Sequence, residues 1–264
     1  RSFHVTGVQT CALPICSDMS FGDFDDDGDV DMVVLNPAGT SRFYDNRRQG
    51  IFSDISDRAG LDFVGQPSSI VMGDYNNDGY LDIFIADLSA EHHAIFKNKG
   101  DGTFIKDKKS LAGVFGLNEF SAIQAKLADL DNDGYLDILV AGSAAESDKK
   151  KDGLILLHND GYGKYTDASA TLPSGLSLIE HIYTIDLDND GDLDIIQIND
   201  LGQLQALRND GGNLNNYLKI RLAGLRTGSS KNNYFGIGSK LEVKSGGLYQ
   251  MQSVNKPVSH FGLG

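Results

Sequence analysis

Four short acidic segments contain the residues of this sequence whose types and spacing are best suited to metal chemistry. They read DFDDDGDVD from Asp23, DYNNDGYLD from Asp74, DLDNDGYLD from Asp129 and DLDNDGDLD from Asp186. Oxygen-bearing side chains occupy positions 1, 3 and 5, glycine follows at position 6, and aspartate closes each segment at position 9. Calcium is a hard cation that takes six to eight oxygen ligands, so the pattern predicts one calcium site per segment.

Each predicted site combines side-chain oxygens from positions 1, 3, 5 and 9 with the backbone carbonyl of position 7. The glycine allows the sharp turn because it readily adopts a positive φ. The expected side-chain ligands are Asp23, Asp25, Asp27 and Asp31; Asp74, Asn76, Asp78 and Asp82; Asp129, Asp131, Asp133 and Asp137; and Asp186, Asp188, Asp190 and Asp194. The expected carbonyls belong to Asp29, Tyr80, Tyr135 and Asp192.

The charge of the chain is concentrated in these segments. The formal net charge is −14, and the predicted side-chain ligands include 15 of the 37 acidic residues, which leaves 22 against 23 lysines and arginines. Carboxylates gathered this closely repel one another unless a cation lies between them. The composition therefore favours about four bound Ca²⁺ ions, although Mn²⁺ or Mg²⁺ would also accept all-oxygen ligands. The negative charge argues against a nucleic-acid partner.

Two other interpretations of the segments, an EF-hand and a turn without metal, compete with this calcium loop. An EF-hand needs glutamate at position 12, where this chain has Val34, Ile85, Val140 and Gln197, so the EF-hand is excluded. Asp, Asn and Gly also form good turns without a metal, which would explain one such segment better than four with matching ligand positions.

The elements around the segments repeat with them. The segments begin 51, 55 and 57 residues apart, and each is followed by a short apolar run and then by a second apolar stretch ending in asparagine. Short Ile- and Val-rich runs of this kind predict strands buried on both faces. About four strands in each repeat of this length predict the blades of a β-propeller. The sequence thus predicts an all-β fold: a partial propeller of four-stranded blades with calcium loops, followed by a small C-terminal β module.

The loops and their spacing resemble the FG-GAP or VCBS repeat family of propeller blades. Residues 216–264 resemble the ASPIC and UnbV domain of the cartilage acidic protein family, through Asn216-Tyr217-Leu218, Asn232-Asn233, Gly236-Ile237-Gly238 and the closing Phe261-Gly262-Leu263-Gly264. The resemblance implies propeller blades, calcium binding and a location outside the cell. The family domain continues beyond such an FGLG ending, so we expect residues 214–264 to be an incomplete module.

The N-terminal residues resemble the conceptual translation of a sequencing adaptor, because Val5–Ile15 read VTGVQTCALPI. We therefore expect residues 1–16 to be an artefactual or disordered leader, with four blades over 17–213. Both cysteines, Cys11 and Cys16, lie in that leader, so no disulfide framework is expected. No apolar run is long enough to predict a transmembrane segment.

The expected function is a calcium-binding interaction or adhesion module for a protein or glycan ligand, located extracellularly, in the periplasm or at the cell surface, its signal peptide lost with the missing N-terminus. The alternative is a propeller-based enzyme or accessory domain acting on surface polysaccharide. The sequence has no nucleophile motif, P-loop or zinc motif that favours the enzyme. His92 and His93 are expected to be a solvated pair, and His158 to lie at the surface.

Overall fold

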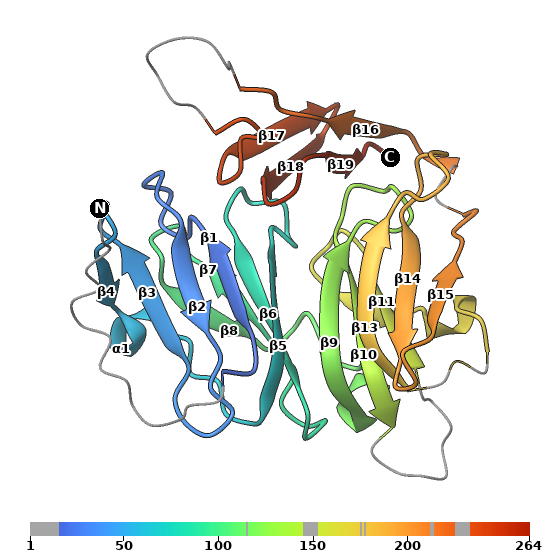
Figure 1. The fold of residues 1–264 in the computed structure, drawn as a ribbon, viewed down its shortest axis with the longest axis horizontal. Coiled ribbons are helices and arrows are strands. Elements are labelled where there is room, and N and C mark those ends of the chain that lie inside the picture. Colours follow the sequence, from blue (N-terminus) through green and yellow to red (C-terminus); the bar gives the residue numbers. More distant parts are fainter. Residues whose placement is uncertain are drawn as a thin grey trace.

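The computed structural model describes residues 16–114, 116–144, 153–174, 176, 178–211, 214–224 and 233–264. Their regular structure is almost entirely antiparallel β-sheet, as the sequence predicts (Figure 1). Of the adaptor-like leader only Cys16 is among these residues, and Asn232 of the C-terminal motif is not. No helix in the described ranges has the length and apolar character needed to cross a membrane.

Three sheets have four strands each, hydrogen-bonded in chain order. The first contains β1 (Met19–Gly22), β2 (Asp31–Val34), β3 (Arg42–Asn46) and β4 (Phe52–Asp54). The second contains β5 (Pro67–Gly73), β6 (Asp82–Asp87), β7 (Ala94–Asn98) and β8 (Phe104–Asp107). The third contains β9 (Phe120–Ala128), β10 (Asp137–Ala144), β11 (Gly153–Asn159) and β12 (Tyr165–Asp167). Short helices follow their outer strands: α1 (Ser56–Ala59), η1 (Leu117–Glu119) and η2 (Ser169–Thr171).

The fourth sheet has three strands in the described part of the chain, although four are expected in each repeat. It contains β13 (Ile179–Ile185), β14 (Asp194–Asn199) and β15 (Leu204–Leu207). The outer strands of the other sheets begin at Phe52, Phe104 and Tyr165, each six residues after the repeat asparagine. The equivalent position here is Asn215. The chain continues to the C-terminal module instead.

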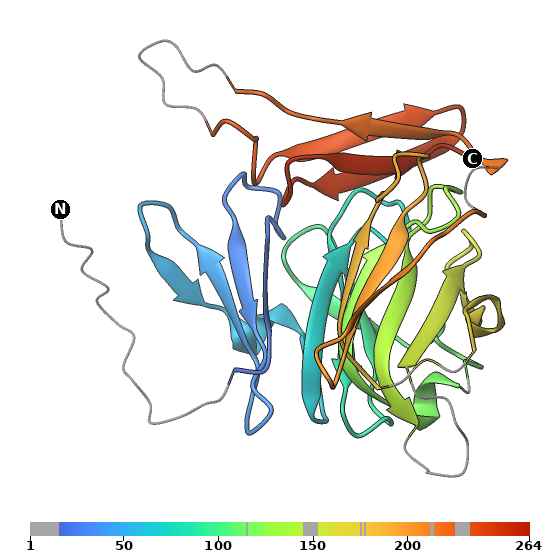
Figure 2. The ribbon, with the colours of Figure 1, turned by 45° about the vertical axis from the view of Figure 1, so that its right-hand side comes forward.

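The four sheets stand side by side through their first strands. β1 contacts β5, β5 contacts β9, and β9 contacts β13. Each sheet is therefore radial, with its first strand innermost and its last strand outermost, which is the arrangement of propeller blades. The sheets form the row that is seen from two directions in Figure 1 and Figure 2.

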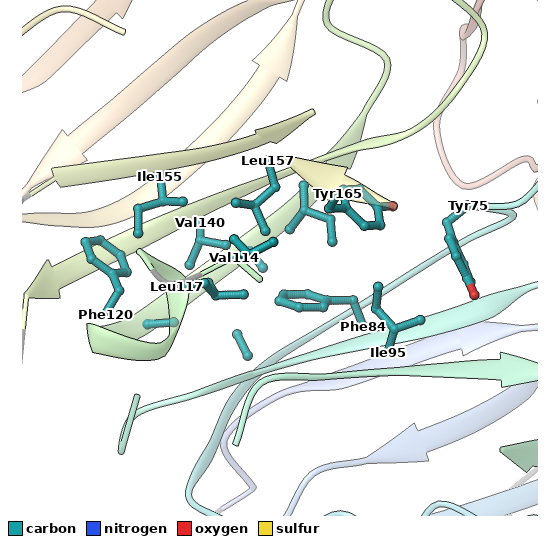
Figure 3. Close-up of a cluster of buried hydrophobic side chains, with 14 residues drawn as sticks. Tyr75, Phe84, Ile95, Val114, Leu117, Phe120, Val140, Ile155, Leu157 and Tyr165 are labelled. Atoms are coloured by element: carbon teal, nitrogen blue, oxygen red, sulfur yellow. The ribbon is translucent and has the colours of Figure 1, made fainter. Parts of the chain in front are cut away.

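Hydrophobic side chains fill the space between neighbouring sheets. Between the second and third sheets, Phe84 and Ile95 pack with Val140, Ile155 and Leu157, all at most 2% exposed (Figure 3). A separate cluster joins the third and fourth sheets. A single blade could not bury both of its faces, so each blade is stabilised by its neighbours.

Three phenylalanine rings hold the first and second sheets together. Phe24 lies 5.1 Å from Phe43 and 5.5 Å from Phe104, measured between ring centroids, in edge-to-face geometry. Such aromatic pairs add to the free energy of burial because the positive edge of one ring meets the negative face of another. Phe24 is position 2 of the first acidic loop, so this core begins inside the loop itself.

The C-terminal module is built from two strand pairs. β16 (Tyr217–Ile220) pairs with β19 (Ser259–Gly262), and β17 (Lys240–Ser245) pairs with β18 (Leu248–Ser253). The module lies across one end of the row of sheets, the end at which the acidic loops are found (Figure 1, Figure 2). The division at residue 214 between blades and an ASPIC and UnbV domain remains a prediction.

The repeat asparagine ties each blade to the blade before it. Asn98 Nδ2 donates to the Phe24 carbonyl at 2.8 Å and to the Leu81 carbonyl at 3.1 Å. Asn159 and Asn209 repeat this pair of hydrogen bonds, each joining position 2 of the preceding loop to its own loop. The amide therefore satisfies buried carbonyl groups at every interface between described blades.

We expect Asn159→Ala to destabilise the protein by about 2 kcal/mol, because the buried Tyr75 carbonyl loses the Asn159 donor, whereas the Leu136 carbonyl keeps the Tyr165 hydroxyl as a donor. Asn46→Ala is the matched control. Both side chains accept a turn hydrogen bond through Oδ1, but Asn46 Nδ2 donates within its own blade, to the Val30 carbonyl at 3.0 Å. Urea unfolding should show the smaller loss for Asn46→Ala; equal losses would contradict the inter-blade role.

Candidate metal centres

The four acidic loops have the same backbone conformation. Position 4 is a non-glycine residue with positive φ in each loop, between 55° and 65°, at Asp26, Asn77, Asn132 and Asn189. The glycine at position 6 also has a positive φ, between 87° and 103°. Asp and Asn tolerate the left-handed region better than other side chains do, and glycine adopts it without a steric penalty. These two residues wrap the chain so that the alternate side chains turn inward.

Hydrogen bonds within each loop hold the predicted ligands in place. The position 1 carboxylate accepts the backbone N–H of the position 6 glycine, at 2.8 Å for Asp74 and 3.0 Å for Asp23, Asp129 and Asp186. The position 5 carboxylate accepts the N–H of position 7, between 2.9 and 3.2 Å. The loop backbone therefore orients the carboxylates through these hydrogen bonds alone.

Three carboxylates of each loop lie close together. Oxygens lie within 4.8 Å of one another in four sets: Asp23, Asp25 and Asp27; Asp74, Asp78 and Asp82; Asp129, Asp131 and Asp133; and Asp186, Asp188 and Asp194. A further set joins Asp131 and Asp137 to His158. Asp31, Asn76 and Asp190 are predicted ligands that none of these sets includes.

The position 9 aspartates are buried and also have a structural role. Asp31 Oδ1 accepts the N–H of Asn46 at 2.9 Å, and its Oδ2 accepts the N–H of Phe24 at 3.0 Å. Asp137 and Asp194 make the same pair of bonds with their own blades. Position 9 thus connects the loop to the repeat asparagine, and its service as a metal ligand remains a prediction, like that of the position 7 carbonyls.

Each loop contains one predicted ligand oxygen that is buried without a hydrogen-bond donor. These atoms are Oδ1 of Asp25, Asn76, Asp129 and Asp186. A buried oxygen without a donor is costly, and a hard cation is the group that satisfies it without needing a proton. The donor sets therefore fit a calcium ion in all four loops.

Burial changes the acidity of these groups. It raises the pKa of Asp82 and of Asp129 to about 8, with neighbouring loop carboxylates adding to the effect. Burial also raises the pKa of Asp31, Asp74 and Asp133 to about 6. Desolvation disfavours the charged carboxylate, and a bound cation would reverse that preference.

The C-terminal module contacts the loops directly. The Gly262 N–H donates to Asp129 Oδ2 at 3.1 Å, and Asn215 Nδ2 donates to the Asp131 carbonyl at 2.9 Å. Lys240 Nζ lies 2.9 Å from Asp26 Oδ1. The module therefore supplies donors and charge to the first and third loops, a relation that the sequence alone did not indicate.

The module places one positive charge on the fourth loop. Lys219 of β16 forms an ion pair with Asp186, the position 1 ligand. Burial would raise the pKa of Asp186, but the hydrogen bond and charge of Lys219 outweigh it and lower that pKa. Calcium would have to displace this ammonium group to reach Asp186.

The expectation that His93 is solvated is wrong, whereas His158 is partly exposed, with 36% of its side chain accessible. His93 is 9% exposed, not solvated: its Nδ1 accepts the Asp87 N–H, and its Nε2 lies 2.9 Å from the Phe120 carbonyl. His158 does not simply point to the surface, since its Nδ1 lies 3.2 Å from Asp137 Oδ1. The position of this residue beside the acidic loop is visible only in three dimensions.

A Ser–His–Asp contact bears on the enzyme alternative. Ser89 Oγ lies 3.1 Å from His92 Nδ1, and the hydroxyl donates to Asp87. A hydrolytic triad needs the carboxylate on one imidazole nitrogen and the serine on the other. Here Asp87 lies 4.0 Å from the nitrogen that faces the serine, and it also accepts the Ser89 N–H at 2.7 Å. Asp87 therefore accepts hydrogen bonds from Ser89 and does not orient His92 as the carboxylate of a catalytic triad would.

Comparison with known proteins agrees with this architecture. Human cartilage acidic protein 1 is 25% identical over 253 residues, covering 89% of this chain and 37% of that protein. Chicken integrin alpha-8 is 29% identical over 202 residues, covering 65% of this chain and 18% of the integrin. The chain thus spans little more than a third of the length of the first relative.

A solved structure also matches, a lectin of Agrocybe aegerita studied for its recognition of non-reducing terminal N-acetylglucosamine. It has a TM-score of 0.46 and 22% identity, covering 73% of this chain and 53% of the lectin chain. The model of the FG-GAP-like repeat matches residues 23–85, 74–140 and 129–197, so each match runs from one acidic loop into the strand after the next. This chain belongs to the FG-GAP-like repeat family and is related to cartilage acidic protein 1.

Proposed function

We propose that this chain is a calcium-binding segment of an extracellular or cell-surface β-propeller that acts as an interaction or adhesion module. The observation that carries the proposal is the buried ligand oxygen without a donor that recurs in all four loops. Calcium would cross-link each loop and stiffen the blade that follows it. The relatives support an interaction role over a catalytic one.

The proposed ligand is a protein or a glycan. A glycan array and a screen of extracellular matrix proteins, each run with calcium and with chelator, test this role. Binding that requires calcium supports an interaction module. Hydrolysis of a surface polysaccharide, dependent on residues of this chain, would favour the enzyme alternative instead.

The third loop tests the metal proposal. Removing the position 3 ligand with Asp131→Ala should cost up to about 2.7 kcal/mol of stability when calcium is near 100 Kd, because binding to the folded state stabilises it by mass action. In chelator the cost should be small, since one repelling carboxylate is lost. Asp62→Ala is the control, an exposed carboxylate outside the loops.

Thermal unfolding of the three proteins in calcium and in chelator measures the difference. An Asp131→Ala protein that melts like the wild type under both conditions would show that the loop is only a turn.

The raised carboxyl pKa values predict a pH dependence. Without an ion, the folded protein holds protons on Asp82 and Asp129 that the unfolded chain would release, so their contribution to stability is lost as pH rises through about 8. Calcium needs the ionised form and must displace these protons. The stabilisation by calcium should therefore grow between pH 6 and pH 8, with proton release on binding.

Calorimetry in buffers of different ionisation enthalpy measures the released protons, and melting temperatures in calcium and chelator give the stabilisation at each pH. Asp129→Asn should reduce the proton release. A stabilisation by calcium that is constant across this range would refute the expectation.

A further inference from the structure

One position in each blade places a side chain of variable charge beside the acidic loop. It is the residue immediately before the repeat asparagine: Asp45, Lys97, His158 and Arg208. The N–H of that asparagine donates to Oδ1 of the position 9 aspartate at 2.8 or 2.9 Å in every blade. This hydrogen bond fixes the backbone next to the loop, so the preceding side chain lies close to the carboxylates.

Three of these side chains place nitrogen groups beside loop carboxylates. Lys97 Nζ lies 2.9 Å from Asp78 Oδ2, in the second loop. Arg208 Nη1 lies 3.7 Å from Asp188 Oδ2, in the fourth. In the third loop, the His158 ring nitrogen lies 3.2 Å from Asp137 and 3.5 Å from Asp131.

The first blade has a carboxylate at this position instead. Asp45 is 3% exposed, and its Oδ2 pairs with Arg47 at 2.6 Å and Arg58 at 3.4 Å. Its Oδ1 is buried without a hydrogen-bond partner, as is Oδ1 of Asp25. The two arginines therefore satisfy only one of the two Asp45 oxygens.

Asp45 shares a cavity with two predicted ligands of the first loop. Asp25, Asp31 and Asp45 line this cavity of about 230 Å³. Arg47, Arg58 and the turn at Asp101–Thr103 of the second blade also line it. Carboxylates facing one space repel one another, and the two donor-free oxygens have no protein group to satisfy them. A divalent cation would meet both requirements.

We propose that Asp45 is an additional ligand of the first calcium site, and that the residue before the repeat asparagine adjusts the calcium affinity of its own loop, in addition to the effect of Lys219 and Lys240 of the module. The inference rests on the proposed calcium function. The first loop gains a carboxylate and is the tightest site. The second and fourth loops have a built-in cation that calcium must overcome.

The proposed order of calcium affinities follows from the charge of each set of ligands. Calcium affinity in loop sites depends on the number of charged ligands and on how rigidly they are held. At short range and partial burial, a lysine ammonium beside the ion opposes binding, whereas another carboxylate favours it. The repeats thus share one backbone conformation, and the residue before the repeat asparagine is one position at which their charge differs.

Calcium titration of the metal-free 264-residue chain by calorimetry tests the assignment. Asp45→Asn, which keeps the shape and removes the charge, should weaken the tightest class of sites by about tenfold. Asp62→Asn, the same change at an exposed position, should leave the isotherm unaltered. In an Asp25→Ala background, Asp45→Asn should have little further effect, because the site has already lost a ligand.

Lys97→Gln gives an independent test in case Asp45→Asn does not fold in chelator, since the Lys97 side chain is 43% exposed. It should raise the affinity of a weaker site by several-fold. A wild-type isotherm from Asp45→Asn, or from Lys97→Gln where Asp45→Asn does not fold, would overturn the inference. The proposed function would still stand, because the wild-type protein binds calcium. If wild type itself binds no calcium, the proposed function fails first.

Discussion

Repulsion between the carboxylates of the acidic loops is the constraint on which the rest of the structure depends. Each loop brings aspartates close together although their charges repel, and burial makes their charged forms still less favourable. Backbone N–H groups meet part of this cost: the position 6 glycine donates to position 1, and the repeat asparagine donates to position 9. These donors leave one ligand oxygen per loop unsatisfied, which is where a cation is needed.

The same loops are the junctions of the fold. The position 2 carbonyl of a loop accepts a hydrogen bond from the repeat asparagine of the next blade. At Phe24, the side chain of this position also packs in the hydrophobic core between blades. The C-terminal module rests on the loops through Gly262 and Lys219. An ion bound in a loop would therefore reduce the mobility of the strand that follows the loop, of the interface with the next blade and of the contact with the C-terminal module. This coupling explains how a fold without a described disulfide could depend on metal for rigidity.

The sequence predicts the blades well because two signals agree there: the spacing of the acidic segments and the short apolar runs that become β2, β6, β10 and β14. It does not predict the contacts between segments far apart in the chain. Asn159 is recognisable as a repeated residue, yet its bond to Tyr75 depends on how blades stack. His93 looks like half of a polar pair, yet it is buried and its Nε2 lies 2.9 Å from the Phe120 carbonyl of β9. The described part of the last sheet has three strands, where the sequence predicts four. Local pattern determines the strands, whereas burial and pairing of polar groups depend on tertiary packing.

The central claim is that the four loops are calcium sites built on a shared backbone. Diffraction from crystals of this chain grown in calcium, with anomalous differences used to identify the ion, tests it most directly. The claim predicts an ion in each loop, about 2.3–2.6 Å from the oxygens of positions 1, 3 and 5, with the Asp25 and Asp129 oxygens among them. Loops that contain only water at millimolar calcium, with the same carboxylate positions, would contradict it.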